Sequence, residues 1–427
     1  MPRIPHLSLT IVLLLSMGVL ANAQAQYQVL YSLGANGSED GNVPAGKLVF
    51  DQQGDLYGTT EGGGANASGT VFELSPLAGG GWAESVIHSF CSQLNCADGA
   101  NPAAGLILDG LGNLYGTTSS GGNNGQVCCW GTVFELSPPS APGGVWTESV
   151  LYTFGGNTTG DGCYPEDRLT FDAAGNLYGT ASQCSGTRYA AGSVFKLTPS
   201  SNGPWSETVL YRFCANGHGG CPDGAGPKAG LTFDESGNLY GTTYGGGSSG
   251  GAGRGTVYEL SPNANGEWTE TVLHSFGLDG SGPLSSIDLD QAGNLYGTVS
   301  YGGLGYQNCL YDCGGLFRVT KDGEGWKTSL FQFNGPNGGN PAAGIFLISQ
   351  RETAFGTTRY GGTQGAGTVF ELHGKTGTAL YTFCSQPGCT DGSEPLAALI
   401  SGKSGHLFGT TAKGGAYGQG VVFEITP

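Results

Sequence analysis

The chain has 427 residues, of which 82 are glycine and 11% are charged, and its formal net charge is −17. So acidic a chain is a poor partner for nucleic acid, because binding to phosphates needs clustered Lys and Arg side chains. Abundant glycine with 10% aromatic residues is typical of short strands joined by tight turns, not of helices.

Residues 1–25 are predicted to be a secretory signal peptide. Arg3 precedes an apolar run from Leu7 to Leu20, and small residues at 21–25 supply a cleavage site. The run is short for a membrane span, although a retained N-terminal anchor is the alternative. We therefore expect a secreted or periplasmic mature chain, residues 26–427, which forms a single domain without a membrane span.

A phrase resembling Leu-Tyr-Gly-Thr-Thr occurs seven times, at intervals of 53 to 63 residues. Its central glycines are Gly58, Gly116, Gly179, Gly241, Gly297, Gly356 and Gly409. In the second copy, apolar residues alternate in four segments, 104–109, 114–118, 131–136 and 146–154. Repeats of four short strands predict an all-β, seven-bladed β-propeller with four antiparallel strands in each blade.

The two ends of the repeat region predict how the ring closes. The last copy stops after its third strand, residues 421–425, whereas residues 27–33 form a fourth strand without a blade. An open ring would leave two unpaired sheet edges. We expect residues 27–33 to complete the last blade, which a linear solenoid would have no reason to require.

The repeated phrases resemble those of the GloVer-type tandem repeat family of secreted bacterial proteins. Asn-Leu-Tyr-Gly-Thr-Thr, Gly-Thr-Val-Phe-Glu-Leu and phrases like Val-Leu-Tyr-Ser-Phe carry this resemblance over residues 27–427. It implies repetition and an extracellular location but no known activity, so no catalytic residue is carried over. Asp-x-x-Gly-Asn-Leu-Tyr is also similar, more weakly, to a phrase of NHL-type propellers.

The twelve cysteines are predicted to form local disulfides in an oxidising compartment. The expected pairs are Cys91–Cys96, Cys163–Cys184, Cys214–Cys221, Cys309–Cys313 and Cys384–Cys389. Cys128 and Cys129 could form a strained vicinal bridge or pair elsewhere. Zinc is the rival interpretation, but no two CxxC pairs lie at ligand spacing.

All twelve cysteines lie in loops between strands 4 and 1 or between strands 2 and 3. Both kinds of loop open on the same rim of a propeller, so one rim is predicted to carry long, cross-linked loops. Rigidly held loops at one end of a scaffold are a usual place for binding. We call it the Cys-rich rim and expect the ligand there.

Four residues depart from the repeat and are candidate ligand-binding residues. Lys47, Arg168 and Asp288 lie on innermost strands, near the central channel, where they could equally pair with one another or be solvated. Trp130, in a loop between strands 2 and 3, could stack on a sugar face.

A repeated Asp, followed by Gly and then Pro, recurs on the same rim. It occurs at Asp40, Asp98, Asp161, Asp223, Asp279 and Asp391, whereas the sixth copy has Asn337. The last five of these acids are weak candidates for calcium ligands. Capping of each turn by its own Asp is the structural alternative, which the repetition favours.

The preferred functional hypothesis is a secreted, non-catalytic binding or scaffold protein. Its Cys-rich rim would recognise a glycan, a surface polymer or a protein, and the chain would be a monomer without a cofactor, calcium being optional. The alternative is a hydrolase, lyase or lactonase that uses carboxylates at the channel mouth, with calcium as an option. Convergence of Asp288 and Arg168 with another acid in a pocket would favour the enzyme.

Overall fold

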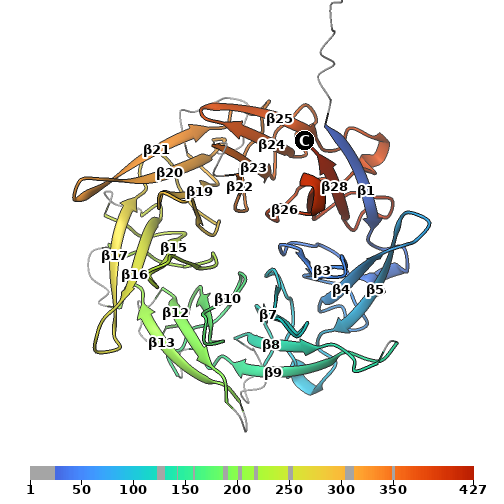
Figure 1. Cartoon of the computed structure of the whole chain (residues 1–427), viewed down its shortest axis with the longest axis horizontal. Coiled ribbons are helices and arrows are strands. Elements are labelled where there is room, and N and C mark those ends of the chain that lie inside the picture. The colour runs from blue at the N-terminus through green and yellow to red at the C-terminus, as the bar shows by residue number, and fades with distance from the viewer. Residues whose placement is uncertain are drawn as a thin grey trace, which may run out of the picture.

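Seven four-stranded antiparallel sheets stand around a common axis, as Figure 1 shows. The computed structural model describes residues 25–427 except 123–129, 142, 157–158, 186–190, 201–203, 216–219, 249–252, 303–311 and 349–351. The predicted signal peptide, but for Ala25, lies outside the described residues. The predicted all-β, seven-bladed propeller is confirmed.

Each blade takes its strands in chain order from the axis outward, except the last, whose outermost strand comes from the N-terminal end. The seven sheets are β2 (Val49–Phe50), β3 (Leu56–Thr60), β4 (Thr70–Pro76) and β5 (Trp82–Ser89); β6 (Ile107–Leu108), β7 (Leu114–Thr118), β8 (Thr132–Ser137) and β9 (Thr147–Thr153); β10 (Thr170–Phe171), β11 (Leu177–Ala181), β12 (Ser193–Thr198) and β13 (Ser206–Arg212); β14 (Thr232–Phe233), β15 (Leu239–Thr243), β16 (Thr256–Pro262) and β17 (Trp268–Ser275); β18 (Asp288–Leu289), β19 (Leu295–Val299), β20 (Gly315–Asp322) and β21 (Gly325–Gln332); β22 (Phe346–Ile348), β23 (Thr353–Thr358), β24 (Thr368–His373) and β25 (Thr376–Thr382); and β26 (Ile400–Ser401), β27 (Leu407–Thr411), β28 (Val421–Thr426) and β1 (Gln26–Ser32). Short 3₁₀ turns lie at η1 (Gly37–Asp40), η2 (Leu94–Cys96), η4 (Pro387–Cys389) and η5 (Lys403–Gly405).

The N-terminal strand closes the ring, as the sequence predicts. β1 pairs antiparallel with β28, from Gln26 opposite Thr426 to Ser32 opposite Val421 (Figure 1). The ring of Tyr27 stacks on Tyr381 of the sixth blade, with centroids 3.9 Å apart. The last blade therefore combines the two ends of the described chain and leaves no free edge on β28.

The glycine of the repeated phrase makes room for an aromatic ring. A Cβ added to Gly116 would lie only 2.6 Å from Cζ of Phe134, on the neighbouring strand β8. The repeated glycine of each of the other six copies lies equally close to an aromatic ring on the third strand of its blade: Phe72, Phe195, Tyr258, Phe317, Phe370 and Phe423. These rings are fully buried, so the repeated glycine is a packing requirement of the blade.

The threonine after that glycine joins each blade to the next. Thr59 donates a hydrogen bond of 2.8 Å to the carbonyl oxygen of Ala104, on the innermost segment of the second blade. Six further bonds repeat it: Thr117 to Pro165, Thr180 to Ala229, Thr242 to Ser285, Thr298 to Ala343, Thr357 to Ala397 and Thr410 to Pro44. The last one joins the seventh blade to the first, so these bonds run right round the axis.

The hydrophobic core lies in layers between neighbouring blades. Tyr115 of the second blade and Phe195 of the third, for example, belong to one buried cluster. Outer-strand tryptophans cover the second-strand tyrosine of the preceding blade, as in the pair Tyr57 and Trp146, whose centroids are 5.8 Å apart. A single blade exposes both of its faces, so the blades are stable only when stacked.

Candidate functional site

Disulfides brace the described loops of the Cys-rich rim, in most cases within a single loop. Four predicted disulfides are confirmed: Cys91–Cys96, Cys163–Cys184, Cys214–Cys221 and Cys384–Cys389. Cys163–Cys184 joins a loop between strands 4 and 1 to a loop between strands 2 and 3, so the two kinds of loop do share one rim. Cys313 is also disulfide-bonded. Cys309, the predicted partner of Cys313, lies outside the described residues, and so do Cys128 and Cys129.

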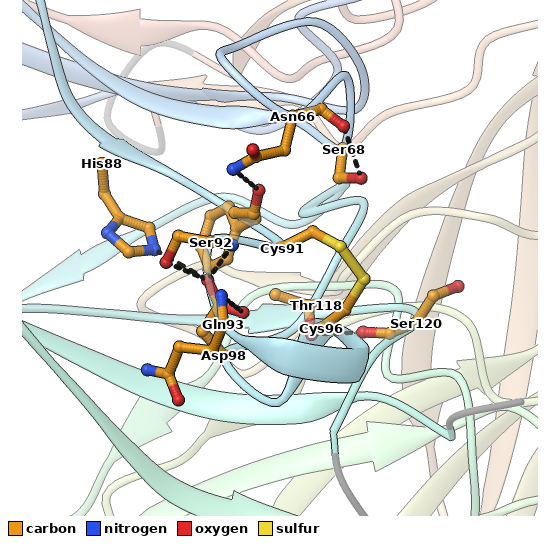
Figure 2. Close-up of a disulfide and its surroundings, with 11 residues drawn as sticks. Asn66, Ser68, His88, Cys91, Ser92, Gln93, Cys96, Asp98, Thr118 and Ser120 are labelled. Atoms are coloured by element: carbon orange, nitrogen blue, oxygen red, sulfur yellow. Dashed lines mark hydrogen bonds and ion pairs between the residues drawn. A yellow bond between two sulfur atoms is a disulfide. The ribbon is translucent and has the colours of Figure 1, made fainter. Parts of the chain in front are cut away.

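The repeated rim aspartates accept hydrogen bonds from their own loops. Figure 2 shows Asp98 beside the Cys91–Cys96 disulfide, where it accepts from the amide and hydroxyl of Ser92, both at 2.8 Å. The hydroxyl of the fourth-strand Tyr152 likewise donates to Asp161 at 2.6 Å. These contacts hold the loops in place.

The fourth-strand residue that faces the rim acid differs between blades. Where His274 replaces the tyrosine, its Nε2 lies 2.9 Å from Asp279. In the sixth copy, where Asn337 replaces the acid, the fourth-strand residue is Phe331, which has no hydroxyl to donate. Among the described residues, no group of three or more His, Cys, Asp or Glu side chains could hold a metal ion. The calcium assignment therefore stays a prediction.

Four outer-strand glutamates lie near these rim acids across the blade interfaces. They are Glu84, Glu148, Glu207 and Glu270, which face Asp40, Asp98, Asp161 and Asp223. Burial, and then the neighbouring carboxylate, raises the pKa of each glutamate to about 7. One carboxyl oxygen of each is buried without a hydrogen-bond partner among the described residues.

We expect the protein to lose stability as the pH rises from about 5 to about 8. A glutamate whose pKa is raised in the folded state binds its proton more tightly there than in the unfolded chain. The stability that it contributes is therefore complete below its ordinary pKa, and it is lost as the pH rises through the folded-state pKa of about 7. Urea unfolding at both pH values measures this. Glu148→Gln should flatten the dependence and raise the free energy of unfolding at the higher pH, whereas exposed Glu324→Gln should change neither. Equal slopes for the wild type and Glu148→Gln would contradict it.

A left-handed residue precedes the first strand of every blade on this rim. It is followed by Pro in each case and has φ between +54° and +66°: Val43, Asn101, Tyr164, Gly226, Gly282, Asn340 and Glu394. The amide of Asn101 donates to Ser68 of the preceding blade, and its carbonyl accepts from Ser119 of its own blade. Five of the seven are not glycine, which costs backbone strain, and such strain is found at functional sites.

An axial cavity of about 410 Å³ opens on the Cys-rich rim. Small residues from the segments before the innermost strands, such as Gly46, Ala103 and Gly344, form much of its wall. All seven blades contribute lining residues, so the cavity lies on the propeller axis. The channel is therefore open at this end and polar in part.

Three of the predicted ligand-binding residues converge on the axis. Lys47 and Arg168 line the cavity together with Asp167, which accepts hydrogen bonds from the amides of Arg168 and Gly230. Burial, opposed by Lys47 and Arg168, raises the pKa of Asp288 to about 6. Burial, and then Arg168, lowers the pKa of Lys47. Charges from blades 1, 3 and 5 thus act on one another across the channel.

Sequence reasoning missed a cluster of tyrosines beside Lys228 and Arg359, two cations that line this cavity. Tyr244 is 40% exposed, and Nζ of Lys228 lies 5.7 Å from the centre of its ring. The guanidinium of Arg359 lies 5.0 Å from the ring of Tyr360. Burial, and then Tyr244, raises the pKa of Tyr301, on which Arg359 and Tyr360 also act. One sequence feature could have pointed to this cluster. Within three residues after the repeated Gly-Thr phrase of their blades come Tyr244, Tyr301, Arg359 and Tyr360.

Ion pairs fix the two cations at this mouth. Lys228 lies 3.0 Å from Glu166, and Arg359 lies 2.9 Å from Glu394, which also pairs with Lys413. Gly282 allows the rings of Tyr244 and Tyr301 to approach its backbone closely, because a Cβ at this position would lie 3.0 Å from Tyr244 and 3.1 Å from Tyr301. We call Tyr244, Tyr301 and Tyr360, with Lys228 and Arg359, the mouth cluster.

Trp130 belongs to the packing of the rim. A Cβ on Gly156 would lie 2.8 Å from its indole, and the ring meets Tyr164 edge-on at 6.1 Å. It also packs against a buried cluster between the second and third blades. Its stacking on a sugar stays a prediction.

No helix in the described part of the chain is both long and apolar enough to cross a membrane.

Comparisons with known proteins identify the repeat and the fold. No curated protein matches the sequence. A protein of unknown function from Dyadobacter fermentans has a similar structure with a TM-score of 0.46 and 10% identity, over 94% of this chain and 98% of that one. A polysaccharide lyase, the ulvan lyase of family PL25 solved with bound -[GlcA(1-4)Rha3S]-, has a TM-score of 0.50 and 13% identity, over 90% and 94%. At 13% identity the likeness to the lyase shows the fold alone. The model of the Gloeobacter/Verrucomicrobia repeat matches residues 18–183, 83–311 and 248–427, so the chain belongs to that repeat family.

Proposed function

We propose that this protein binds glycans outside the cytoplasm, at the mouth of the axial cavity, and does not transform them. The observation that carries the proposal is the mouth cluster, in which three tyrosines from three neighbouring blades lie beside two cations that line the axial cavity. The disulfides support an extracellular or periplasmic location, because such bonds persist in oxidising compartments.

The chemistry of the mouth cluster suits a sugar chain. Tyrosine rings offer flat apolar faces with a polar edge, which can cover the C–H face of a pyranose while the hydroxyl forms hydrogen bonds. Lys228 and Arg359 add donors that are held in fixed positions by Glu166 and Glu394. A partly apolar concave site with a few oriented polar groups is the usual form of a small-ligand pocket.

A glycan array of neutral and acidic oligosaccharides, read with and without a chelator, tests this function. We expect selective binding that Tyr244→Ala weakens about tenfold, because a stacked ring contributes roughly 1 kcal/mol or more. Tyr417→Ala is the matched control, since Tyr417 is 55% exposed but lies on the seventh blade, outside the mouth cluster. Flat responses across the array would remove the glycan proposal, and loss of signal with chelator would add calcium to it.

The enzyme hypothesis keeps one specific observation in its favour. Asp288, whose pKa is raised to about 6, acts with Lys47 and Arg168 on the same axial space, and such a carboxyl could serve as an acid or base. The similar ulvan lyase suggests polysaccharides as substrates to test. Incubation with uronate-containing polysaccharides, followed by the appearance of unsaturated products or reducing ends, would reveal cleavage. Activity lost in Asp288→Asn would favour the enzyme, and an inactive wild type would dismiss it.

A further inference from the structure

The interface between the fifth and sixth blades lacks the tryptophan that covers the equivalent place in the first three interfaces of the ring. In the first interfaces of the ring, an outer-strand tryptophan lies over the second-strand tyrosine of the preceding blade. The pairs are Tyr57 and Trp146, Tyr115 and Trp205, and Tyr178 and Trp268, with centroids 5.8, 6.3 and 6.4 Å apart. The sixth blade has no tryptophan in its outer strand β25, and a short turn at Gly374 and Lys375 precedes that strand.

Tyr296 of the fifth blade, which faces this tryptophan-free strand, is less covered than its counterparts in the other blades. The seven second-strand aromatic residues are all described, and the other six are buried, at 4% to 7% exposure. Tyr296 is the only one that is not buried. A cavity of about 580 Å³ lies beside its ring, between β19 to β21 on one side and β22 to β24, with the turn at Gly374 and Lys375, on the other.

Arg318 is the charged group inside this cavity. It occupies a third-strand position that holds glutamate in five other blades, and its guanidinium lies 5.5 Å from the centre of the Tyr296 ring. Its Nε is buried and has no hydrogen-bond partner among the described residues. A buried donor without an acceptor is costly, so an acceptor supplied by a ligand would be favourable.

The other lining residues indicate the chemistry of the rest of a ligand that carries that acceptor. About half of the wall is apolar, formed by Leu316, Leu330, Phe331, Leu347 and Leu372, and Ser329 and Gln332 of β21 add polar groups. The remaining charged lining residues, Glu352 and Lys375, are exposed turn residues of opposite sign on the rim opposite the Cys-rich one. Arg318 is therefore the inner cation of this lining, whereas Glu352, its one carboxylate, lies near enough to act on the Tyr296 hydroxyl.

We propose that this interblade cavity binds a small molecule with an apolar body and one carboxylate, such as a medium-chain fatty acid. The fork of Arg318 matches the two oxygens of a carboxylate, and the leucines match a hydrocarbon chain. This site goes beyond the proposed glycan binding, because it lies between two blades and opens away from the axial mouth. The two sites share no lining residue.

Calorimetric titration of the whole mature chain with octanoate, and in parallel with octan-1-ol, tests the proposal. We expect saturable one-to-one binding of octanoate. Arg318→Gln should weaken it about tenfold or more while changing octanol binding little, because only the carboxylate uses the guanidinium. Ala354→Phe, which fills the cavity from β23, should weaken both probes.

Lys196→Gln is the matched control. Lys196 lies 5.7 Å from the Tyr178 ring in the third blade, where Trp268 covers that tyrosine, so its loss should leave octanoate binding unchanged. Circular dichroism melting checks that each variant is folded, and either Arg318→Gln or Ala354→Phe suffices if the other unfolds. The absence of saturable octanoate binding to the wild type, or equal affinity in a folded Arg318→Gln or Ala354→Phe variant, would overturn the proposal.

Discussion

Deleting residues 26–33 should leave a chain that no longer folds into a stable ring. This segment supplies the outermost strand of the last blade and buries Leu30 and Leu33, which are 9% and 0% exposed. Burying two leucines contributes about 3–6 kcal/mol, a large part of the roughly 5–15 kcal/mol that stabilises a typical domain. The deletion also exposes the edge of β28, which favours association between chains.

Size-exclusion chromatography and thermal unfolding measure this effect. We expect the shortened chain to aggregate or to melt far below a control chain that begins at Gln26. A synthetic peptide of residues 26–33 should restore part of the lost stability, because it can pair with the same edge. An unchanged melting temperature after the deletion would mean that β1 does not close the ring in solution.

Replacing Gly116 with alanine should destabilise the protein by about 1–3 kcal/mol through overpacking. The new methyl group would lie 2.6 Å from Phe134 and 2.9 Å from Leu106, both of which are buried. Chemical unfolding at equilibrium measures the change.

Two further variants separate the clash from a general effect of removing glycine. Gly110→Ala should be close to neutral, because nothing lies within 4 Å of a Cβ at that position. Adding Phe134→Leu to Gly116→Ala should cost less than the sum of the two single changes, since the smaller side chain relieves the contact. If Gly116→Ala is as stable as Gly110→Ala, the ring of Phe134 does not require glycine.

The candidate sites differ in how far the sequence could predict them. Lys47, Arg168 and Asp288 were identified because they break a repeat at a known place in the blade, and the structure brings them to one channel. The mouth cluster was missed because its residues come from three blades, and their proximity depends on how the blades are rotated about the axis. The cavity at Tyr296 was missed because its walls come from two blades, and a change in the outer strand of one blade bears on a ring of the other.

The sequence alone determined the number of blades, the four-strand unit, the strand that closes the ring and the pairs of local cysteines, because each is written in neighbouring or periodically repeated residues. Only the tertiary structure decided that the repeated Thr bonds to the next blade, that the repeated Gly faces an aromatic ring, and which side chains meet at the axis. The physical reason is that periodicity reports the contacts within one blade, whereas the sites lie between blades. There, residues 40 to 60 positions apart or more meet through packing that no local pattern records.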